Sequence, residues 1–413
     1  MENYNLFQPL QSGFCTHHSC SSAIALLADK WLNSINNSNL SGVVFLDLSK
    51  AFDRVDHDIL LRKLSVYLKN SPALPLFSSF LHDRKQRVFL NGSFSSEKPV
   101  SYGVPQGSVL GPVLFCIYIN DLPLHITDSS VECHMLADDT TLQTQSTQTL
   151  NIQLSLQSAL NDVSEWCASN RMVLNPQKSK SMIITTRQKH QLASLSLNLI
   201  VDNKAVEQVN EHKLLGVIID SKMCWQPHID KLQNRLSKAL FLLSKLQSVI
   251  NQEARQLFYN AHIKAHIDYA SIVWDGCSAV LFNKINSQYR RAVKLILPNN
   301  SLSTIDKMKA INILPLRHHF LYNKSILMFK SQNCLCPKYL QDMFTPSFSH
   351  YTEFKHNLAC PRPRLDLFKT SMSYSGASAW NSLPPHLKSM QGSLPAFKKC
   401  LFKHFYDCAF DLR

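Results

Sequence analysis

Three aspartates combine a residue type with a placement that could support metal-dependent chemistry. Asp47 follows the apolar run Val43-Val44-Phe45-Leu46, and Asp138-Asp139 stand side by side between two short strand-like runs. An Asp-Asp pair by itself is more often a solvated turn or a helix cap than a catalytic group. Because Asp47 is far from the pair in sequence, the three carboxylates can meet only if the fold brings their strands together in one sheet.

Such a meeting of carboxylates would have a definite chemistry. Carboxylates that converge in a partly buried site cannot all stay ionised without cations. Mg²⁺ prefers hard oxygen ligands and is usually held by one or two carboxylates together with substrate phosphates. Two such ions about 3.5–4 Å apart activate an attacking hydroxyl and neutralise a leaving group. The pattern therefore indicates phosphoryl transfer assisted by two Mg²⁺ ions, with Mn²⁺ as a possible substitute.

The elements that must position these residues are predicted from apolar periodicity and turn signals. Helical spacing predicts amphipathic helices over 21–35, 58–68 and 152–166, and an apolar helix that follows the loop 103–108 and reaches about Asn120. Strands are predicted at 43–46, 87–90, 133–136, 140–143, 182–185 and 214–219. Tight hairpin turns are predicted at Asn91-Gly92 and Asp202-Asn203. From Pro227 onward the pattern is mainly helical, so the sequence predicts an α+β fold followed by a helical region.

Composition narrows the class of partner without fixing it. The formal net charge is +14, with a pI of about 9.2. This surplus favours a polyanionic partner such as nucleic acid, although anionic membranes and acidic proteins also attract a basic protein. The twelve cysteines lack the spacing of a zinc site, which predicts free thiols.

Targeting signals are not expected. The first ten residues carry Glu2, Asn3 and Gln8 where a signal peptide needs an apolar core. The longest apolar stretch, Val109 to Ile119, is interrupted by Gly111 and Pro112 and is too short to cross a bilayer. We therefore expect an intracellular protein of the nucleus or cytoplasm that is not secreted and has no membrane partner.

The segments that surround the aspartates resemble the successive signatures of reverse transcriptases. They are Phe45 to Asp53, Gly103 to Ser108 and Ala137 to Thr140, in this order along the chain. The runs Ala51 to His57 and Leu110 to Pro112 look like the non-LTR (LINE-type) branch, in particular jockey-like elements. Leu174 to Ser179 and Lys213 to Val217 are similar to that family's Asn-Pro-x-Lys and primer-grip segments.

This resemblance implies an RNA-directed DNA polymerase, which adds dNTPs to the 3′-OH of a DNA primer on an RNA template by two-metal phosphoryl transfer. The implied architecture is the palm of a polymerase right hand, an antiparallel sheet with flanking helices. The implied divisions are a residual fingers segment (1–40), a palm (41–221), a helical thumb (222–297) and a C-terminal helical region without an assigned role (298–413).

Roles for single residues follow from the resemblance. Asp47 and Asp138 would be metal ligands, and Asp139 would complete the catalytic carboxylate cluster. Phe52 would lie under the sugar of the incoming nucleotide, where its ring excludes a 2′-hydroxyl, although it could also be a plain core residue. Gln106 and Gly107 would contact the nucleotide. Lys178 would neutralise or protonate the leaving pyrophosphate, or else be a solvated loop residue.

A basic helix face is a further candidate for nucleic-acid binding. Lys231, Arg235, Lys238 and Lys245 share one face of the helix predicted after Pro227. In a thumb this face would follow the nucleic-acid backbone, and Gly216 of the primer-grip-like segment would contribute beside it. Basic helix faces are also common as simple solvated surfaces.

The sequence departs from the resembled pattern at its beginning. Relatives of this kind carry an endonuclease and more of the fingers ahead of Gln11, so we expect a truncated copy of an element. Cys15 stands where an Arg is usual, which removes a cation near the nucleotide. Leu136 replaces an aromatic residue ahead of the Asp-Asp pair.

These departures leave two alternatives to an active polymerase. One is a non-catalytic, retrotransposon-derived protein that binds nucleic acid through its basic helix. The other, more distant, is a maturase-like or telomerase-like relative within the same polymerase class.

Overall fold

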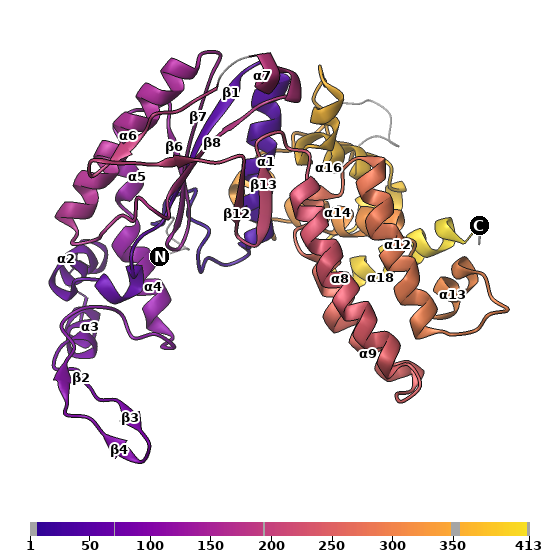
Figure 1. The fold of residues 1–413 in the computed structure, drawn as a ribbon, viewed down its shortest axis with the longest axis horizontal. Helices are drawn as coiled ribbons and strands as arrows, with labels where there is room; N and C mark the ends of the chain where they lie inside the picture. The colour runs from indigo at the N-terminus through magenta and orange to yellow at the C-terminus, as the bar shows by residue number, and fades with distance from the viewer. Residues whose placement is uncertain (1–5, 70, 193–194, 348–355, 411–413) are drawn as a thin grey trace. The chain divides into compact units, whose positions relative to one another are not determined.

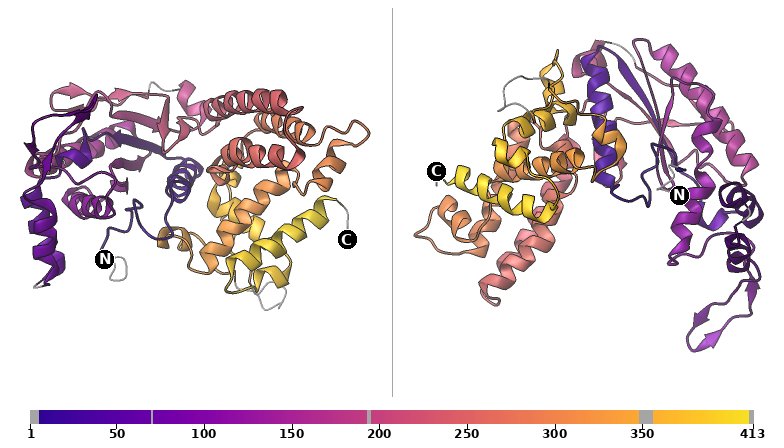
Figure 2. Two further views of the ribbon diagram at one scale, coloured as in Figure 1. Left: turned by 90° about the horizontal axis from the view of Figure 1, so that it is seen from below. Right: turned by 180° about the vertical axis from the view of Figure 1, so that it is seen from behind.

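The protein was analysed as a computed structural model that describes residues 6–69, 71–192, 195–347 and 356–410 (Figure 1). The chain forms two compact units. One, here called the sheet unit, comprises residues 1–18, 40–183 and 190–209. The other, here called the helical unit, comprises residues 19–39, 184–189 and 210–413. Figure 2 gives two further views.

A five-stranded sheet is the frame of the sheet unit, with the strand order β11-β8-β1-β7-β6. Its strands are β1 (Leu40–Leu46), β6 (Glu132–Leu136), β7 (Asp139–Ser146), β8 (Lys180–Ile184) and β11 (Glu207–Gln208). β7 is antiparallel to both β1 and β6, whereas β11 runs parallel to β8. The sheet is therefore mixed, and the prediction of an antiparallel sheet was wrong at this edge. The reason is topological, because the chain leaves the sheet after β8 and returns for two residues in the same direction.

Helices and small hairpins complete the sheet unit. The helical elements are η2 (Ala51–Arg54), α2 (His57–Leu68), α3 (Ala73–Leu81), α4 (Leu110–Ile119), α5 (Leu122–His125) and α6 (Thr149–Ser169). The small strands are β2 (Lys85–Gln86), β3 (Phe89–Leu90), β4 (Ser93–Phe94), β5 (Lys98–Pro99), β9 (Ile200–Val201) and β10 (Lys204–Ala205). β2 pairs with β5, β3 with β4, and β9 with β10.

The α6 helix closes the core over the central strands. Its apolar residues recur at helical spacing and bury Ile152, Leu156, Leu160 and Val163. All seven residues of β1 are buried, so this strand packs on both of its faces. The close approach of the helix requires Gly42, since a Cβ there would lie 2.0 Å from Cγ2 of Ile152.

The helical unit has its own core. Its main helices are α1 (Cys20–Asn36), α8 (Gln226–Leu246), α9 (Gln252–Tyr259), α12 (Ala279–Ile296), α14 (Leu316–Gln332), α16 (Met372–Asn381) and α18 (Leu394–Ala409). Shorter elements are α7 (Arg187–Leu192), β12 (Glu211–Leu214), β13 (Val217–Asp220), η3 (Asn260–Lys264), α10 (Ala265–Asp268), α11 (Ser271–Trp274), α13 (Thr304–Ala310), α15 (Lys338–Gln341), η5 (Asp366–Thr370) and α17 (Pro385–Lys388). The stacked rings of Phe329 and Phe397, with centroids 4.1 Å apart, join α14 to α18.

Most elements predicted from local sequence are confirmed, including the helices α1, α2, α4, α6 and α8 and both tight hairpin turns. The single strand predicted over 214–219 was wrong. Leu215 and Gly216, with φ angles of 46° and 87°, turn the chain between β12 and β13. The apolar run continues through this turn, so periodicity alone did not reveal it.

All twelve cysteines lie in the described part of the chain and are free thiols, as expected. Of the helices that can be described, none combines the length and the apolar composition required to cross a membrane.

Candidate active site and basic cavity

The three aspartates meet at one end of the sheet. Asp47 directly follows β1, and Asp138 and Asp139 form the turn and the first position of β7. Leu46 pairs with Thr140, so the next step in this antiparallel register sets Asp47 opposite Asp139. The turn is tight, because Leu136 pairs with Asp139 and Ala137 takes a positive φ of 57°.

The pKa values of Asp138 and Asp139 also indicate that the three carboxylates lie close together. Burial raises the pKa of Asp138, and the charge of Asp47 raises it further. Burial also raises the pKa of Asp139, with additional repulsion from Asp138 and Asp47. No Lys, Arg or His side chain of the described residues counters these shifts by stabilising the charged carboxylates. The site therefore holds excess negative charge.

A divalent cation would fit the donor chemistry of this site. Within the described ranges, no group of three or more His, Cys, Asp or Glu side chains is arranged so that it could by itself hold a metal ion. Mg²⁺ does not need such a group, because one or two carboxylates, waters and substrate phosphates complete its shell. The uncompensated charge and the all-oxygen donors agree with a hard cation.

Residues 10–13 contact the Asp-Asp turn and the strand that leads into it. The Ser12 amide donates to the Met135 carbonyl oxygen (2.8 Å), and the Met135 amide donates to Leu10 (3.0 Å). The buried Gln11 side chain accepts from the Ala137 amide through Oε1 at 3.2 Å. Gly13 lies against the same turn, since a Cβ on it would be 2.3 Å from the Ala137 nitrogen. The sequence had not singled out Gln11 or Gly13 as positioning residues, because their contact with the turn is long-range.

The loop that carries Lys178 is fixed beside Asp47. The Asn175 amide donates to the Asp47 carbonyl oxygen (2.8 Å), and the Asp47 amide donates to Ser179 Oγ (3.1 Å). Leu174 forms a bridge with Leu48 on the same side. Lys178 itself is exposed on this loop.

The segments of Phe52 and Gln106 are also joined to one another. The Val104 amide donates to the Phe52 carbonyl oxygen (3.0 Å), and Gln106 Nε2 donates to Asp53 Oδ1 (2.9 Å). The Phe52 ring is half-buried and stacks on Phe115 with centroids 4.2 Å apart. Gly107 is exposed with a φ of 81°, and no described atom lies within 4 Å of where a Cβ would stand. A ligand can therefore approach its backbone closely.

Cys15 lies beside the buried Cys116 in this region. Its thiol donates weakly to the carbonyl oxygen of Gly13 (3.3 Å), and the buried Cys116 thiol donates to the same oxygen (3.4 Å). Burial, together with the neighbouring Cys15, raises the pKa of Cys116 to about 12. The Cys116 thiol is therefore a small neutral packing group at neutral pH.

The helical unit contains a basic cavity of about 270 Å³. The β12–β13 turn, the first half of α8 and the residues of α10 and its end surround it, and its lining includes Lys213, Gly216, His228, Lys231, Arg235, His266 and Tyr269. The Tyr269 hydroxyl donates to the Leu215 carbonyl oxygen (2.6 Å), which fixes the turn against the aromatic ring. Three of the predicted nucleic-acid-binding residues therefore line one cavity.

The two histidines of this cavity are held neutral. Burial and the nearby Arg235 and Lys231 lower the pKa of His228 to about 4. Consistently, His228 Nδ1 accepts a hydrogen bond from the Ile218 amide (3.3 Å). Burial, Arg235 and His262 also lower the pKa of His266. The permanent positive charge therefore comes from the lysines and the arginine.

Lys238 and Lys245 continue the α8 face beyond the cavity. Lys231, Arg235, Lys238 and Lys245 are all exposed, as expected for one helix face. Sequence reasoning missed Lys213, His266 and Tyr269 as parts of the cavity.

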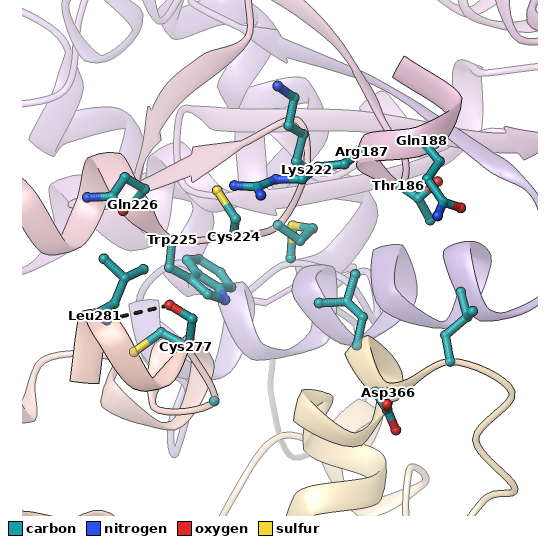
Figure 3. A pocket seen from close by; sticks show the side chains of 15 residues that line it. Thr186, Arg187, Gln188, Lys222, Cys224, Trp225, Gln226, Cys277, Leu281 and Asp366 are labelled. Atoms are coloured by element: carbon teal, nitrogen blue, oxygen red, sulfur yellow. Dashed lines mark hydrogen bonds between the residues drawn. The ribbon is translucent and has the colours of Figure 1, made fainter. Parts of the chain in front are cut away.

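A larger cavity of about 590 Å³ lies elsewhere in the helical unit (Figure 3). Arg187, Lys222, Cys224, Trp225 and Asp366 are among its lining residues. None of the predicted site residues lines it, so it belongs to neither candidate site.

The sequence is similar to a known protein family and to individual members of it. Residues 1–219 match the family model described as "Reverse transcriptase (RNA-dependent DNA polymerase)". The chain is 28% identical over 296 residues to the "Probable RNA-directed DNA polymerase from transposon BS" of Drosophila melanogaster, covering 69% of this chain and 32% of that protein. It is 31% identical over 229 residues to the "RNA-directed DNA polymerase from mobile element jockey" of the same organism, covering 54% and 24%. The chain thus spans about a third or less of these relatives.

Among solved structures, apo telomerase from Candida tropicalis aligns over 74% of this chain and 47% of its own, with 12% identity and a TM-score of 0.39.

Substituting Gly13 tests how strongly the N-terminal segment holds the Asp-Asp turn. Gly13→Ala places a methyl group against the backbone of Ala137, which no side-chain rotation relieves. We expect a loss of unfolding free energy of about 1–3 kcal/mol, measured by urea denaturation. The neighbouring Phe14→Ala, at a side chain that is 56% exposed, serves as control and is expected to change it far less. Equal stabilities for the two variants would contradict the proposed contact.

Removing one negative charge tests the carboxylate cluster. Because the folded pKa of Asp139 is raised, metal-free protein loses stability as the pH rises from about 4 through this pKa. Asp139→Asn should weaken this loss and keep or raise the Tm in EDTA at pH 8. Mg²⁺ at ten times its dissociation constant should stabilise the native protein by about 1.4 kcal/mol. The same Mg²⁺ concentration should stabilise the variant by less. A variant that retains the full Mg²⁺ response would rule out Asp139 as a contributor.

Proposed function

The chain belongs to the reverse transcriptase (RNA-dependent DNA polymerase) family, and we propose that its sheet unit carries the nucleotidyl-transfer centre of such a polymerase. The observation that carries this proposal is the convergence of Asp47, Asp138 and Asp139 at one end of the β1–β7 pair, where no Lys, Arg or His among the described residues stabilises their charges. The substrates would be dNTPs, a DNA primer and an RNA template.

The carboxylates would hold the divalent metal that this family typically uses. Asp47 and Asp138 would be direct ligands and Asp139 would complete the cluster. Bound Mg²⁺, in two positions, would polarise the phosphate and lower the pKa of the attacking 3′-hydroxyl. The residues of the chain would fix the ligand oxygens in place, since Gln11 and Asn175 hold the two backbone segments that bear them. Pre-positioned carboxylates need little rearrangement when the ions bind.

Phe52, Gln106 and Gly107 would form the floor of the nucleotide site. Phe115 packs on one face of the Phe52 ring and limits its movement, which supports a steric role against a 2′-hydroxyl. Gly107 would allow phosphate or sugar to approach the backbone. Lys178 would reach the leaving pyrophosphate from the loop fixed beside Asp47, and its exposure leaves the ammonium group able to move.

The helical unit would hold nucleic acid through its basic cavity and the exposed face of α8. Lys231 and Arg235 supply charge for phosphates, and the Gly216 turn allows a close backbone approach. Lys238 and Lys245 extend the same face. We propose that residues 41–221 act as the palm and 222–297 as the thumb, with 1–40 as a segment of the fingers. The helical residues 298–413 retain no assigned role.

A second candidate function is nucleic-acid binding without catalysis. Cys15 supports it, because a cysteine stands where the resembled pattern has an arginine for the triphosphate. The intact carboxylates support the polymerase. The two functions differ in a single measurable property, incorporation of dNTPs.

Primer extension on an RNA template tests the polymerase. The protein should extend a DNA primer in Mg²⁺ and not in EDTA, and Asp138→Asn should lower kcat/KM by about 10²–10³-fold because a charge that stabilises the transition state is lost. Asp58→Asn, at a side chain that is 82% exposed on α2, is the matched control and should keep full activity. Absence of extension with intact RNA binding would reject the polymerase in favour of the non-catalytic candidate.

The salt dependence of RNA binding tests the face of α8. Replacing Lys231, Arg235 and Lys238 together by Gln should lower the slope of log Kd against log salt by about 2–3, since each lost phosphate contact removes about 0.7–0.9. Lys398, Lys399 and Lys403, exposed on α18, provide the control when they are changed to Gln in the same way. Identical slopes for the two triple variants would show that α8 has no specific role.

A further inference from the structure

The segment from Arg84 to Val100 forms an exposed ribbon in the sheet unit. Its strands β2–β5 and β3–β4 extend away from the sheet (Figure 1). Every residue from 82 to 99 is exposed. Each ladder holds only two residue pairs, which is marginal for an isolated ribbon in water.

The tip of this ribbon shows apolar side chains to solvent. They are Val88, Phe89, Leu90 and Phe94, which are 58–69% exposed. Single exposed apolar residues are common, but a contiguous group on a protruding ribbon indicates a binding surface.

At the tip, two aromatic rings and a guanidinium group lie next to one another. Phe89 and Phe94 are direct cross-strand partners, with ring centroids 4.6 Å apart. The guanidinium of Arg87 lies over the Phe94 ring at 4.1 Å. Arg87, Phe94 and Phe89 therefore form a continuous strip, here called the aromatic strip.

The turn keeps the aromatic strip in this form. Asn91 and Gly92 have φ angles of 49° and 80°, the values of the tight two-residue turn whose twist matches its strands. The Ser95 amide donates to the Val88 carbonyl oxygen (2.8 Å), and the Val88 amide donates to Ser95 Oγ (2.9 Å). The backbone pairing therefore sets the two rings opposite one another.

The positive charge of the ribbon favours an anionic partner. Besides Arg87, the ribbon carries Arg84, Lys85 and Lys98, and of these Lys85 is paired with Glu97 at 3.4 Å. A second copy of the chain would bring the same positive charges together, which is unfavourable. A single-stranded nucleic acid offers both phosphates for the cations and base faces for the rings, whereas a duplex hides its base faces.

We propose that the aromatic strip is a stacking site for unpaired bases of single-stranded nucleic acid. This inference deepens the proposed polymerase function, since the strand bound there would be template that is not yet copied. Phe89 and Phe94 would provide base stacking and Arg87 would provide phosphate or stacking contact. The affinity from the rings would depend little on salt, in contrast to that from α8.

The test is binding of the full chain in EDTA to a fluorescent oligouridylate RNA of about 16 nucleotides. The double variant Phe89→Ala/Phe94→Ala should raise Kd by about 5–100-fold, with an unchanged salt slope. It should not change the weaker affinity for an RNA duplex of equal charge. The control, Leu150→Ala/Leu154→Ala, removes two side chains of α6 that are 62% and 61% exposed and should bind as the native protein does.

Other results would overturn the inference. Kd within twofold of the native value would show that the rings do not bind bases. Light scattering that reveals a native dimer and a monomeric variant, with equal RNA affinity, would assign the strip to an interface between copies. If the native protein bound no RNA at all, the proposed function itself would fail, which is distinct from selective loss in the variant. Unchanged circular dichroism of the variant excludes unfolding as the cause.

Discussion

Repulsion between three carboxylates at one end of a buried strand pair is the constraint on which the candidate active site depends. The β1–β7 register sets Asp47 against Asp139, and the tight turn adds Asp138. Burial and mutual charge make this arrangement unfavourable for metal-free ionised protein, as the raised pKa values show. The hydrophobic packing of the sheet must therefore hold together what electrostatics would separate, until a cation balances the charge.

The surrounding segments secure this arrangement mainly through backbone hydrogen bonds. The chain near Gln11 supports the Asp-Asp turn, and the loop near Asn175 supports Asp47. Backbone contacts suit this purpose because they fix position without adding charge to an already charged site. The same logic explains Gly13, whose lack of a side chain permits direct contact between two backbones.

The helical unit has a site of excess positive charge, in contrast to the negative carboxylate cluster. Its basic cavity gathers Lys213, Lys231 and Arg235. Burial, together with the charges of Arg235 and Lys231, keeps His228 neutral so that it accepts a backbone hydrogen bond. Excess positive charge remains open to solvent and is therefore available to a polyanion. In the sheet unit the aromatic strip adds a surface of a third kind, formed mainly by the exposed rings of Phe89 and Phe94.

Sequence by itself determined the local elements and the identity of the key side chains. Apolar spacing located α6, the Asn91-Gly92 pair located a hairpin, and the motifs that surround Asp47 and Asp138 indicated the family, which the match over residues 1–219 shows. These features are local, because helices and turns are encoded by residues a few positions apart. The mixed sheet, the turn at Gly216, the support from Gln11 and the place of His266 in a basic cavity were decided only by tertiary structure. Each of these depends on pairing between distant segments, and burial and register, which no short window of sequence contains, select that pairing.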